Sequence, residues 1–167
     1  MNGRDAIVTE IPRLRRYARA LTGQDDRADD LVQDTLERAL DKWRFWKSTR
    51  DLRPWLFAIM HNLHIDHHRR ETRIEYCDDE DLPELVQRPE QSDTLELNEL
   101  DHALSLLPLE QREVLLLVAL EELSYADVAK AIGQPKGTVM SRLSRARARL
   151  KAILAGEREP HLKVVSS

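Results

Sequence analysis

Apolar residues recur at spacings of three and four along much of the chain, and this pattern predicts helices rather than strands. The first period runs from Ile7 to Leu21 and predicts a helix that ends at Thr22-Gly23. A second period runs from Ala28 to Trp43, shortly after Asp25-Asp26, whose negative charges suit the amino terminus of a helix. A third follows Pro54, a residue favoured at the first helical position. These three helices make one predicted domain.

The apolar period is lost over residues 76–93, where acidic residues cluster and two prolines interrupt the chain. We interpret this stretch as part of a flexible linker, because it has too few apolar residues to bury. Helical spacing resumes over residues 95–120, with a break at Pro108. Two more helices are therefore expected after the linker.

A helix-turn-helix is predicted near the carboxyl end of the chain. Ser124 and Asp127 resemble the capping box that starts a helix, and Gly133 ends this helix after about two turns. Pro135 then opens a last helix, whose apolar stripe runs from Val139 to Leu150. A short helix, a tight glycine turn and a longer helix are the parts of this motif.

The expected fold is all-α, with two small helical domains joined by an acidic flexible linker. The second domain has four helices and contains the helix-turn-helix. The predicted boundaries are residues 1–74 for the first domain, 75–94 for the linker, 95–155 for the second domain and 156–167 for a tail.

The net charge of −4 conceals an uneven distribution of charge. Residues 1–74 hold 15 basic and 12 acidic side chains, residues 75–101 hold 1 and 11, and residues 102–167 hold 10 and 7. Two basic ends, each with a net charge of +3, thus flank a middle with a net charge of −10. Both ends can therefore meet phosphate although the whole chain is acidic.

The last predicted helix has the strongest charge bias, with six basic residues and no acidic one between Lys136 and Lys151. Basic residues also favour the carboxyl end of any helix, so charge alone leaves a solvated helix end as the alternative. The capped helix and glycine turn favour DNA, because they direct this helix outward, where a recognition helix meets base edges. The expected DNA contacts are Lys136, Thr138, Met140, Ser141, Ser144, Arg145 and Arg149.

Roles within this helix differ with position. Arg145 is placed to bind guanine or phosphate, whereas Arg147 and Arg149 suit phosphate. Arg142 lies nearer the core edge, where it can equally brace the domain. Met140 can equally fill a groove in the core.

Aromatic and basic residues alternate around the break between the second and third predicted helices. This suits single-stranded DNA, because bases stack on aromatic rings while cations hold the backbone. Trp43 and Trp55 also suit core anchors, and we assign them to the core. The remaining candidates at the break are Trp46, Lys47, Arg50 and Arg53. Along the third helix, the residues that suit a duplex-facing surface are Asn62, Asp66, Arg69 and Arg70.

Histidines on the third helix raise a metal hypothesis, since His61, His64 and His68 can share one side of it. No cysteine or glutamate completes a familiar ligand signature there, so we favour a polar helix face and expect neither a metal nor another cofactor. Nothing combines an activated nucleophile with an acid and base, so we do not expect an enzyme.

The chain shows no sign of export or of a membrane segment. Its longest apolar run of interest, Val114 to Leu120, has seven residues, far below the roughly 18 to 20 that cross a bilayer. Charged residues interrupt any signal-peptide core near the amino terminus. A single cysteine, Cys77, is consistent with a reducing compartment. We therefore expect a cytoplasmic protein.

Four segments, in this order and spacing, resemble the extracytoplasmic-function (ECF) class of bacterial RNA polymerase sigma factors, over almost the whole chain. Residues 27–34 (RADDLVQD) resemble the helix that binds the polymerase clamp, and residues 55–62 (WLFAIMHN) the segment that reads the minus-ten element. Residues 123–129 (LSYADVA) and 137–143 (GTVMSRL) resemble the helix-turn-helix that reads the minus-thirty-five element. The resemblance implies a promoter-specificity subunit whose partners are core RNA polymerase and promoter DNA.

The resemblance also implies roles for individual residues. The loop from Phe45 to Arg53 and Asn62 would capture a flipped promoter base, with polymerase binding offsetting the cost of unstacking. Met140 stands where many relatives carry a basic residue, so a thymine methyl is a candidate contact there. An anti-sigma factor is a further implied partner. The residues implied in docking on core polymerase are Asp29, Asp30, Leu31, Gln33 and Asp34, of which Leu31 also serves the domain core.

The linker has to bridge two promoter elements. They lie two helical turns apart, about 70 Å at roughly 34 to 36 Å per turn. About 20 residues span roughly 22 to 27 Å as a coil and up to about 70 Å when extended. We hypothesise that the free chain is compact, with its acidic linker near the basic helices, and that polymerase extends it.

Two other functions remain open at this point. One is a sigma-like decoy that sequesters an anti-sigma factor without touching DNA, although a decoy has no need of the basic last helix. The other is a metal-dependent enzyme that uses the histidines, which would require tightly bound stoichiometric metal.

Overall fold

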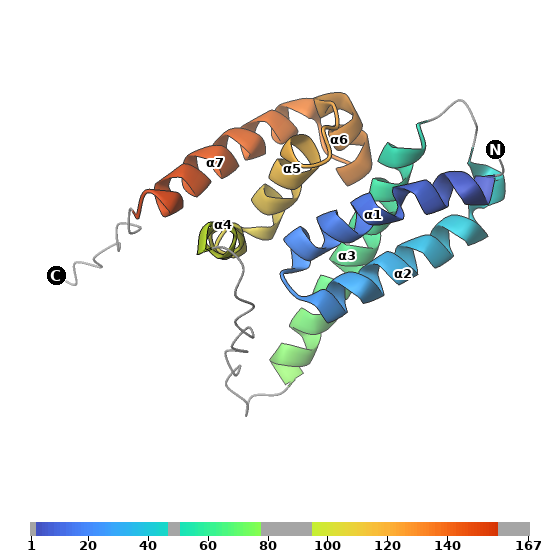
Figure 1. The fold of residues 1–167 in the computed structure, drawn as a ribbon, viewed down its shortest axis with the longest axis horizontal. Helices are drawn as coiled ribbons and strands as arrows, with labels where there is room; N and C mark the ends of the chain where they lie inside the picture. The colour runs from blue at the N-terminus through green and yellow to red at the C-terminus, as the bar shows by residue number, and fades with distance from the viewer. Residues whose placement is uncertain (1–2, 47–50, 78–94, 157–167) are drawn as a thin grey trace.

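A computed structural model describes residues 3–46, 51–77 and 95–156, and within these ranges helices are the only regular secondary structure (Figure 1). The amino-terminal domain consists of α1 (Gly3–Thr22), α2 (Asp25–Asp41), the short 3-10 helix η1 (Trp43–Phe45) and α3 (Leu52–Cys77). The carboxyl-terminal domain consists of α4 (Leu95–Ser105), α5 (Leu109–Ala119), α6 (Tyr125–Ile132) and α7 (Lys136–Leu154). The expected all-α fold and the four-helix second domain are confirmed.

Two details differ from the boundaries expected from the sequence. Helix α3 begins at Leu52, two residues before Pro54, because a proline is tolerated anywhere in a first turn that lacks intrahelical N–H partners. The same helix continues to Cys77, so residues 75–77 of the expected linker are helical. Residues 78–94, the rest of that linker, and residues 157–167 of the expected tail lie outside the described residues.

The amino-terminal domain is a three-helix unit built on the predicted stripes. Leu14 and Tyr17 of α1, Leu31 of α2, and Phe57 and Met60 of α3 are almost completely buried. The rings of Tyr17 and Phe57 meet edge to face with their centroids 4.9 Å apart. Burial of such side chains contributes roughly 1.5 to 3 kcal/mol each, which is why the apolar stripes determine how the helices pack.

Helix α5 is the centre of the carboxyl-terminal domain. Its residues Val114 to Leu117 are all buried, so it has no polar face along this stretch. Helix α7 packs on one side of α5 through Val139, Leu143 and Ala146, and α6 contributes Val128. A helix that is apolar all round needs neighbours on several sides. Helix α5 finds them in α7, α6 and α1 of the other domain.

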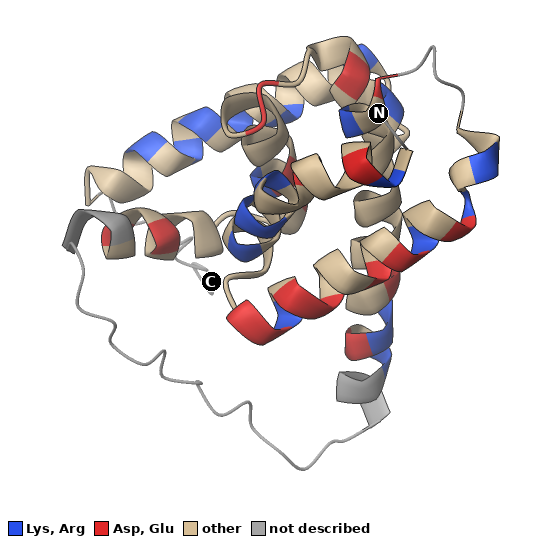
Figure 2. Cartoon of the chain, turned by 45° about the vertical axis from the view of Figure 1, so that its right-hand side comes forward, with Lys and Arg blue, Asp and Glu red and all other residues tan. Residues whose placement is uncertain are grey.

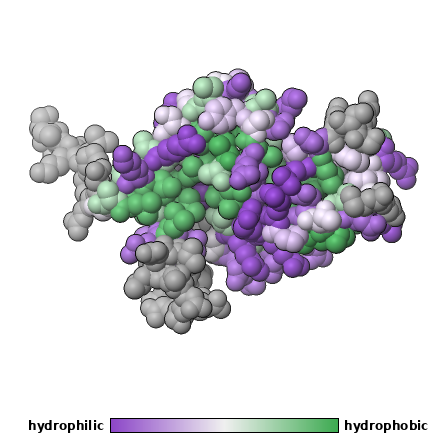
Figure 3. Space-filling model, turned by 45° about the horizontal axis from the view of Figure 1, so that its top comes forward, coloured by the Kyte–Doolittle hydropathy of each residue, from purple (hydrophilic) through white to green (hydrophobic). Residues whose placement is uncertain are grey.

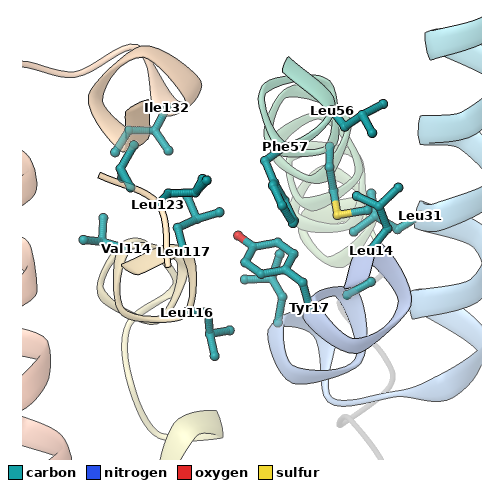
Figure 4. Packing of buried hydrophobic residues seen from close by; sticks show 14 of the residues in the cluster. Leu14, Tyr17, Leu31, Leu56, Phe57, Val114, Leu116, Leu117, Leu123 and Ile132 are labelled. Atoms are coloured by element: carbon teal, nitrogen blue, oxygen red, sulfur yellow. The ribbon is translucent and has the colours of Figure 1, made fainter. Parts of the chain in front are cut away.

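The two domains pack against each other and share one continuous core (Figures 1 and 4). Helix α3 contacts α6, and α1 contacts α5. In Figure 4, Tyr17 and Phe57 face Leu117 and Leu123 across the seam between the domains. On the face drawn in Figure 3, apolar residues form a continuous area over the carboxyl-terminal domain, bordered by hydrophilic residues.

The start of α6 carries the predicted cap. The Ser124 hydroxyl accepts a hydrogen bond from the Asp127 backbone N–H at 3.1 Å, and Gly133 ends the helix in the left-handed conformation, with φ of 67°.

Among the described helices, none is long and apolar enough to cross a bilayer.

Replacing Ser124 with alanine is expected to lower the free energy of unfolding by about 1 kcal/mol, because a backbone donor of α6 loses its partner. Urea unfolding followed by circular dichroism measures this change. Ser144→Ala is the matched control, since Ser144 is exposed on the middle of α7. An equal loss of stability in both variants would contradict a capping role.

Candidate nucleic-acid interface

Helix α7 presents a basic surface that faces away from the amino-terminal domain (Figures 1 and 2). Its apolar stripe is turned toward α5, so the opposite side is left to solvent. Gly133 permits the sharp turn before it, and Pro135 precedes its first residue. Lys and Arg side chains in this arrangement form an electrostatic surface suited to DNA.

The predicted reading residues lie on that outer side to different degrees. Lys136, Ser144 and Arg145 are exposed, and Met140 is 50% exposed, so Met140 does not fill a core groove. Three of the predicted residues are half-buried, namely Thr138, Ser141 and Arg149. The Ser141 hydroxyl donates a hydrogen bond to the Thr138 carbonyl at 3.1 Å.

Arg142 braces the domain. Its guanidinium lies 3.7 Å from the Glu110 carboxylate of α5, and its side chain is only 20% exposed. Of the two roles left open by the sequence, the structure supports the bracing one.

The three tryptophans around η1 form one cluster. Trp43 and Trp46 stack with centroids 4.8 Å apart, and Trp55 lies 6.3 Å from Trp43 and 6.4 Å from Trp46. Trp43 and Trp55 pack against the core, as expected. Trp46 is half-buried with one face covered by Trp43, so less of it is open to a base than its sequence position suggested.

Phe45 is the open ring at this site, with 75% of its surface exposed. The resemblance placed it at the start of the loop from Phe45 to Arg53, but nothing in the spacing distinguished it from Trp46. The short 3-10 turn determines which ring stays exposed, because it directs Trp43 and Trp46 toward the cluster and leaves Phe45 outside. Lys47 and Arg50 lie outside the described residues.

The cations and polar groups expected near the break separate into two sets. Arg53 forms two hydrogen bonds to Glu10, at 3.0 and 3.3 Å, and this contact raises the pKa of its guanidinium. It therefore ties α3 to α1 in this conformation. The set that remains exposed along α3 is Asn62, Asp66, Arg69 and Arg70, which are spaced for one side of the helix.

Helix α2 carries the acidic face implied in polymerase docking, visible as red segments in Figure 2. Asp29, Asp30 and Gln33 are exposed, and Asp34 pairs with His67 of α3 at 3.1 Å. Leu31 is 1% exposed, so in this conformation it is part of the domain core and is not accessible to a binding partner.

This face of α2 borders a hollow of about 840 Å³ between the domains. Asp30, Gln33 and Asp34 line one side, and Leu109 and Arg112 of α5 line another. The carboxyl-terminal domain thus stands beside the surface that the resemblance assigns to polymerase.

The histidines of α3 are spread among different partners. His61 pairs with Glu113 of α5, whereas His67 pairs with Asp34 of α2. His64 is largely buried, and desolvation, aided by His68, His67, His61 and Arg112, lowers its pKa from 6.5 to about 4. No group of three potential ligands arranged for a metal ion occurs among the described residues.

The buried His64 predicts a pH-dependent stability. Its folded pKa is about 4 and its ordinary value is 6.5, so the unfolded chain binds the proton first as pH falls. The stability that neutral His64 contributes is therefore complete above about pH 6.5 and falls by roughly 1 to 3 kcal/mol toward pH 4.

Urea unfolding between pH 7 and pH 4 checks this. His64→Gln is expected to flatten the pH dependence, whereas His102→Gln, at an exposed position on α4 and not among the groups that lower the His64 pKa, leaves it unchanged. A wild-type curve that His64→Gln does not alter would refute the assignment.

Comparisons with known proteins agree on both domains. The family model described as the sigma2 domain of PhyR matches residues 7–61, and that described as sigma-70 region 4 matches residues 97–150. The chain is 42% identical over 152 residues to the ECF RNA polymerase sigma factor EcfG of Rhodopseudomonas palustris, covering 90% of this chain and 84% of that protein.

Solved structures extend the likeness to the arrangement of the helices. The sigma factor RpoE of Bartonella quintana, in complex with the anti-sigma factor NepR, matches with a TM-score of 0.80 and 34% identity, covering 92% of this chain and 97% of that one. CnrH, in complex with the cytosolic domain of CnrY, matches with a TM-score of 0.70 and 27% identity, covering 92% and 88%.

Proposed function

The chain belongs to the ECF RNA polymerase sigma factors, which direct RNA polymerase to promoters, and from this premise we propose how its surfaces divide that task. Helix α7 reads the minus-thirty-five element. The region of η1 and α3 binds the minus-ten element. The acidic face of α2 docks on core polymerase. In this proposal residues 1–74 and 95–155 are the two working units, joined by residues 75–94.

The observation that carries the proposal is the outward side of α7. Its packing on α5 fixes which residues face solvent, and those include Ser144 and Arg145 but no acid. An arginine on the outer side of a recognition helix can hydrogen-bond guanine O6 and N7. The exposed thioether of Met140 suits an apolar contact with a thymine methyl. Lys136 and Arg149 suit phosphates.

The minus-ten surface combines an exposed ring with polar groups along one helix. Phe45, and the free face of Trp46, can stack on bases that leave the duplex, a contact worth roughly 1 to 3 kcal/mol per base. Asn62, Arg69 and Arg70 lie on α3 beyond this cluster, where they would follow the adjoining DNA. Arg53 reaches DNA only if it leaves Glu10.

An anti-sigma partner and a cytoplasmic location complete the proposal. The solved relatives RpoE and CnrH are bound to NepR and to the cytosolic domain of CnrY, and this supports an anti-sigma partner for the present chain. A sigma factor has to meet polymerase and the chromosome, so we place its action in the cytoplasm.

Transcription with purified core polymerase tests the proposal. Promoters are first located by mapping transcript starts after overexpression of the chain, and templates carrying them are then transcribed in vitro. We expect discrete products only when the chain is added to core polymerase. A chain that binds an anti-sigma factor but yields no promoter-dependent product would instead be the decoy.

A further inference from the structure

Arg53, which the proposed function assigns to the minus-ten surface, is engaged by a carboxylate of another helix. Its Nε donates to Glu10 Oε2 of α1 at 3.0 Å, and its Nη2 donates to Glu10 Oε1 at 3.3 Å. Two guanidinium nitrogens thus meet two carboxylate oxygens, in the paired geometry that arginine forms with carboxylates and phosphates alike. Glu10 therefore occupies the donors that a DNA phosphate would use.

The Glu10–Arg53 pair is the most sheltered of the described ion pairs within the amino-terminal domain. The Glu10 side chain is 17% exposed and that of Arg53 is 35% exposed, whereas the side chains of the Arg27–Glu71 pair are 42% exposed or more. Water and salt screen an exposed pair until it contributes little, but they screen a sheltered pair less. The contact is therefore strong enough to influence what Arg53 binds.

Glu10 has no other cation to turn to among the described residues. Arg13, one helical turn further along α1, is directed to Glu121 at 3.7 Å, and Arg53 is the cation that pairs with Glu10. A carboxylate that is largely removed from water is penalised when it loses its partner. Transfer of Arg53 to DNA thus has a cost that an exposed arginine does not have.

Glu10 is also fixed in place, because α1 is held against the tryptophan cluster. Gly3 lies seven residues before Glu10, so at about 100° per residue the two share one side of the helix. The Trp43 ring packs so closely on Gly3 that a Cβ there would overlap it. Ile7, between them, is 3% exposed. Arg53 can therefore move away, but Glu10 cannot follow it.

We propose that Glu10 is a further determinant of the minus-ten surface, where it competes with DNA phosphate for Arg53 and limits how tightly this surface holds single-stranded DNA. The inference rests on the proposed function and adds a residue that weakens binding. The competition changes affinity and leaves sequence preference unchanged, because phosphates carry no sequence information.

Glu10→Gln tests the competition, because the amide keeps the size of the side chain and removes its charge. The variant is assembled with core polymerase, and fluorescence anisotropy follows binding of a labelled single-stranded oligonucleotide that carries the minus-ten element of a mapped promoter. We expect binding roughly 3- to 10-fold tighter than that of the wild type. The slope of log affinity against log salt should steepen by about 0.7, the value for one further phosphate contact on a single strand. A scrambled oligonucleotide should show the same gain.

Two further variants assign the effect to Arg53. Adding Arg53→Gln to Glu10→Gln should remove both the gain in affinity and the added salt dependence. Asp5→Asn is the matched control, since it removes the same charge from an exposed position of α1, and we expect it to change affinity by less than about twofold. If circular dichroism shows that Glu10→Gln is unfolded, Glu10→Asp takes its place, because the shorter side chain reaches Arg53 less well and should also tighten binding.

Unchanged or weaker binding by Glu10→Gln would overturn the inference, because Glu10 would then only brace α3 or orient Arg53 for DNA. An equal gain in Asp5→Asn would overturn it as well, since general charge would account for the effect. Both outcomes leave the proposed function intact. If the wild type assembled with core polymerase does not bind the oligonucleotide at all, the assignment of the minus-ten surface is itself refuted.

Discussion

Arg145→Ala is expected to weaken binding of the polymerase complex to the minus-thirty-five element by roughly 5- to 150-fold, which corresponds to a loss of about 1 to 3 kcal/mol. The guanidinium is exposed on the outer side of α7, and the apolar stripe beneath it is fixed against α5. The alanine variant should therefore lose contacts to DNA without losing its fold. Fluorescence anisotropy on labelled promoter DNA measures the effect.

Lys151→Ala is the matched control, because it removes the same charge from the last turn of the same helix. We expect only a small, sequence-independent weakening from it, together with a shallower salt dependence. Arg145→Ala should retain normal affinity for core polymerase. Equal effects of the two variants on upstream recognition would mean that α7 contributes general charge and reads no bases.

Asp30→Ala combined with Gln33→Ala is expected to weaken binding to core polymerase by roughly 10- to 100-fold, since a few residues carry most of the energy at such interfaces. Both side chains are exposed on α2, and neither supports the domain core. Titration of labelled chain with core polymerase measures the change. DNA contacts of α7 should be unaffected once the variant is saturated with polymerase.

Asp25→Ala provides the comparison for that variant. Asp25 lies five residues before Asp30, about 140° around the helix at 100° per residue, and its side chain is 81% exposed. Its loss should leave polymerase affinity unchanged. If the Asp30 and Gln33 variant binds core normally, the docking face lies elsewhere on the amino-terminal domain.

The helices of both domains follow from the sequence because each buries a stripe that the apolar period reveals. Leu14, Leu31 and Val139 are all within the predicted stripes and are all buried. The helix-turn-helix was equally predictable, since the cap at Ser124 and the turn at Gly133 are local features. Local chemistry of this kind needs no knowledge of the rest of the fold.

The seam between the domains was not predictable in detail, because its partners are distant in the chain. Glu121 meets Arg16 across 105 residues, and Glu113 meets His61 across 52. Nothing in the sequence distinguishes these glutamates from solvated surface charges. For the same reason, the engagement of Arg53 by Glu10 and the partial burial of Trp46 required the tertiary structure.

In the proposed function, one chain uses two surfaces, held by polymerase, to read two promoter elements at a fixed separation. Inserting five base pairs between the elements of a mapped promoter tests it most directly, because half a helical turn places them on opposite faces of the duplex. In vitro transcription with core polymerase and this chain should then fall to near background. A control promoter whose spacer has the original length but an altered sequence should preserve transcription. Undiminished initiation from the five-base-pair insertion would contradict the account.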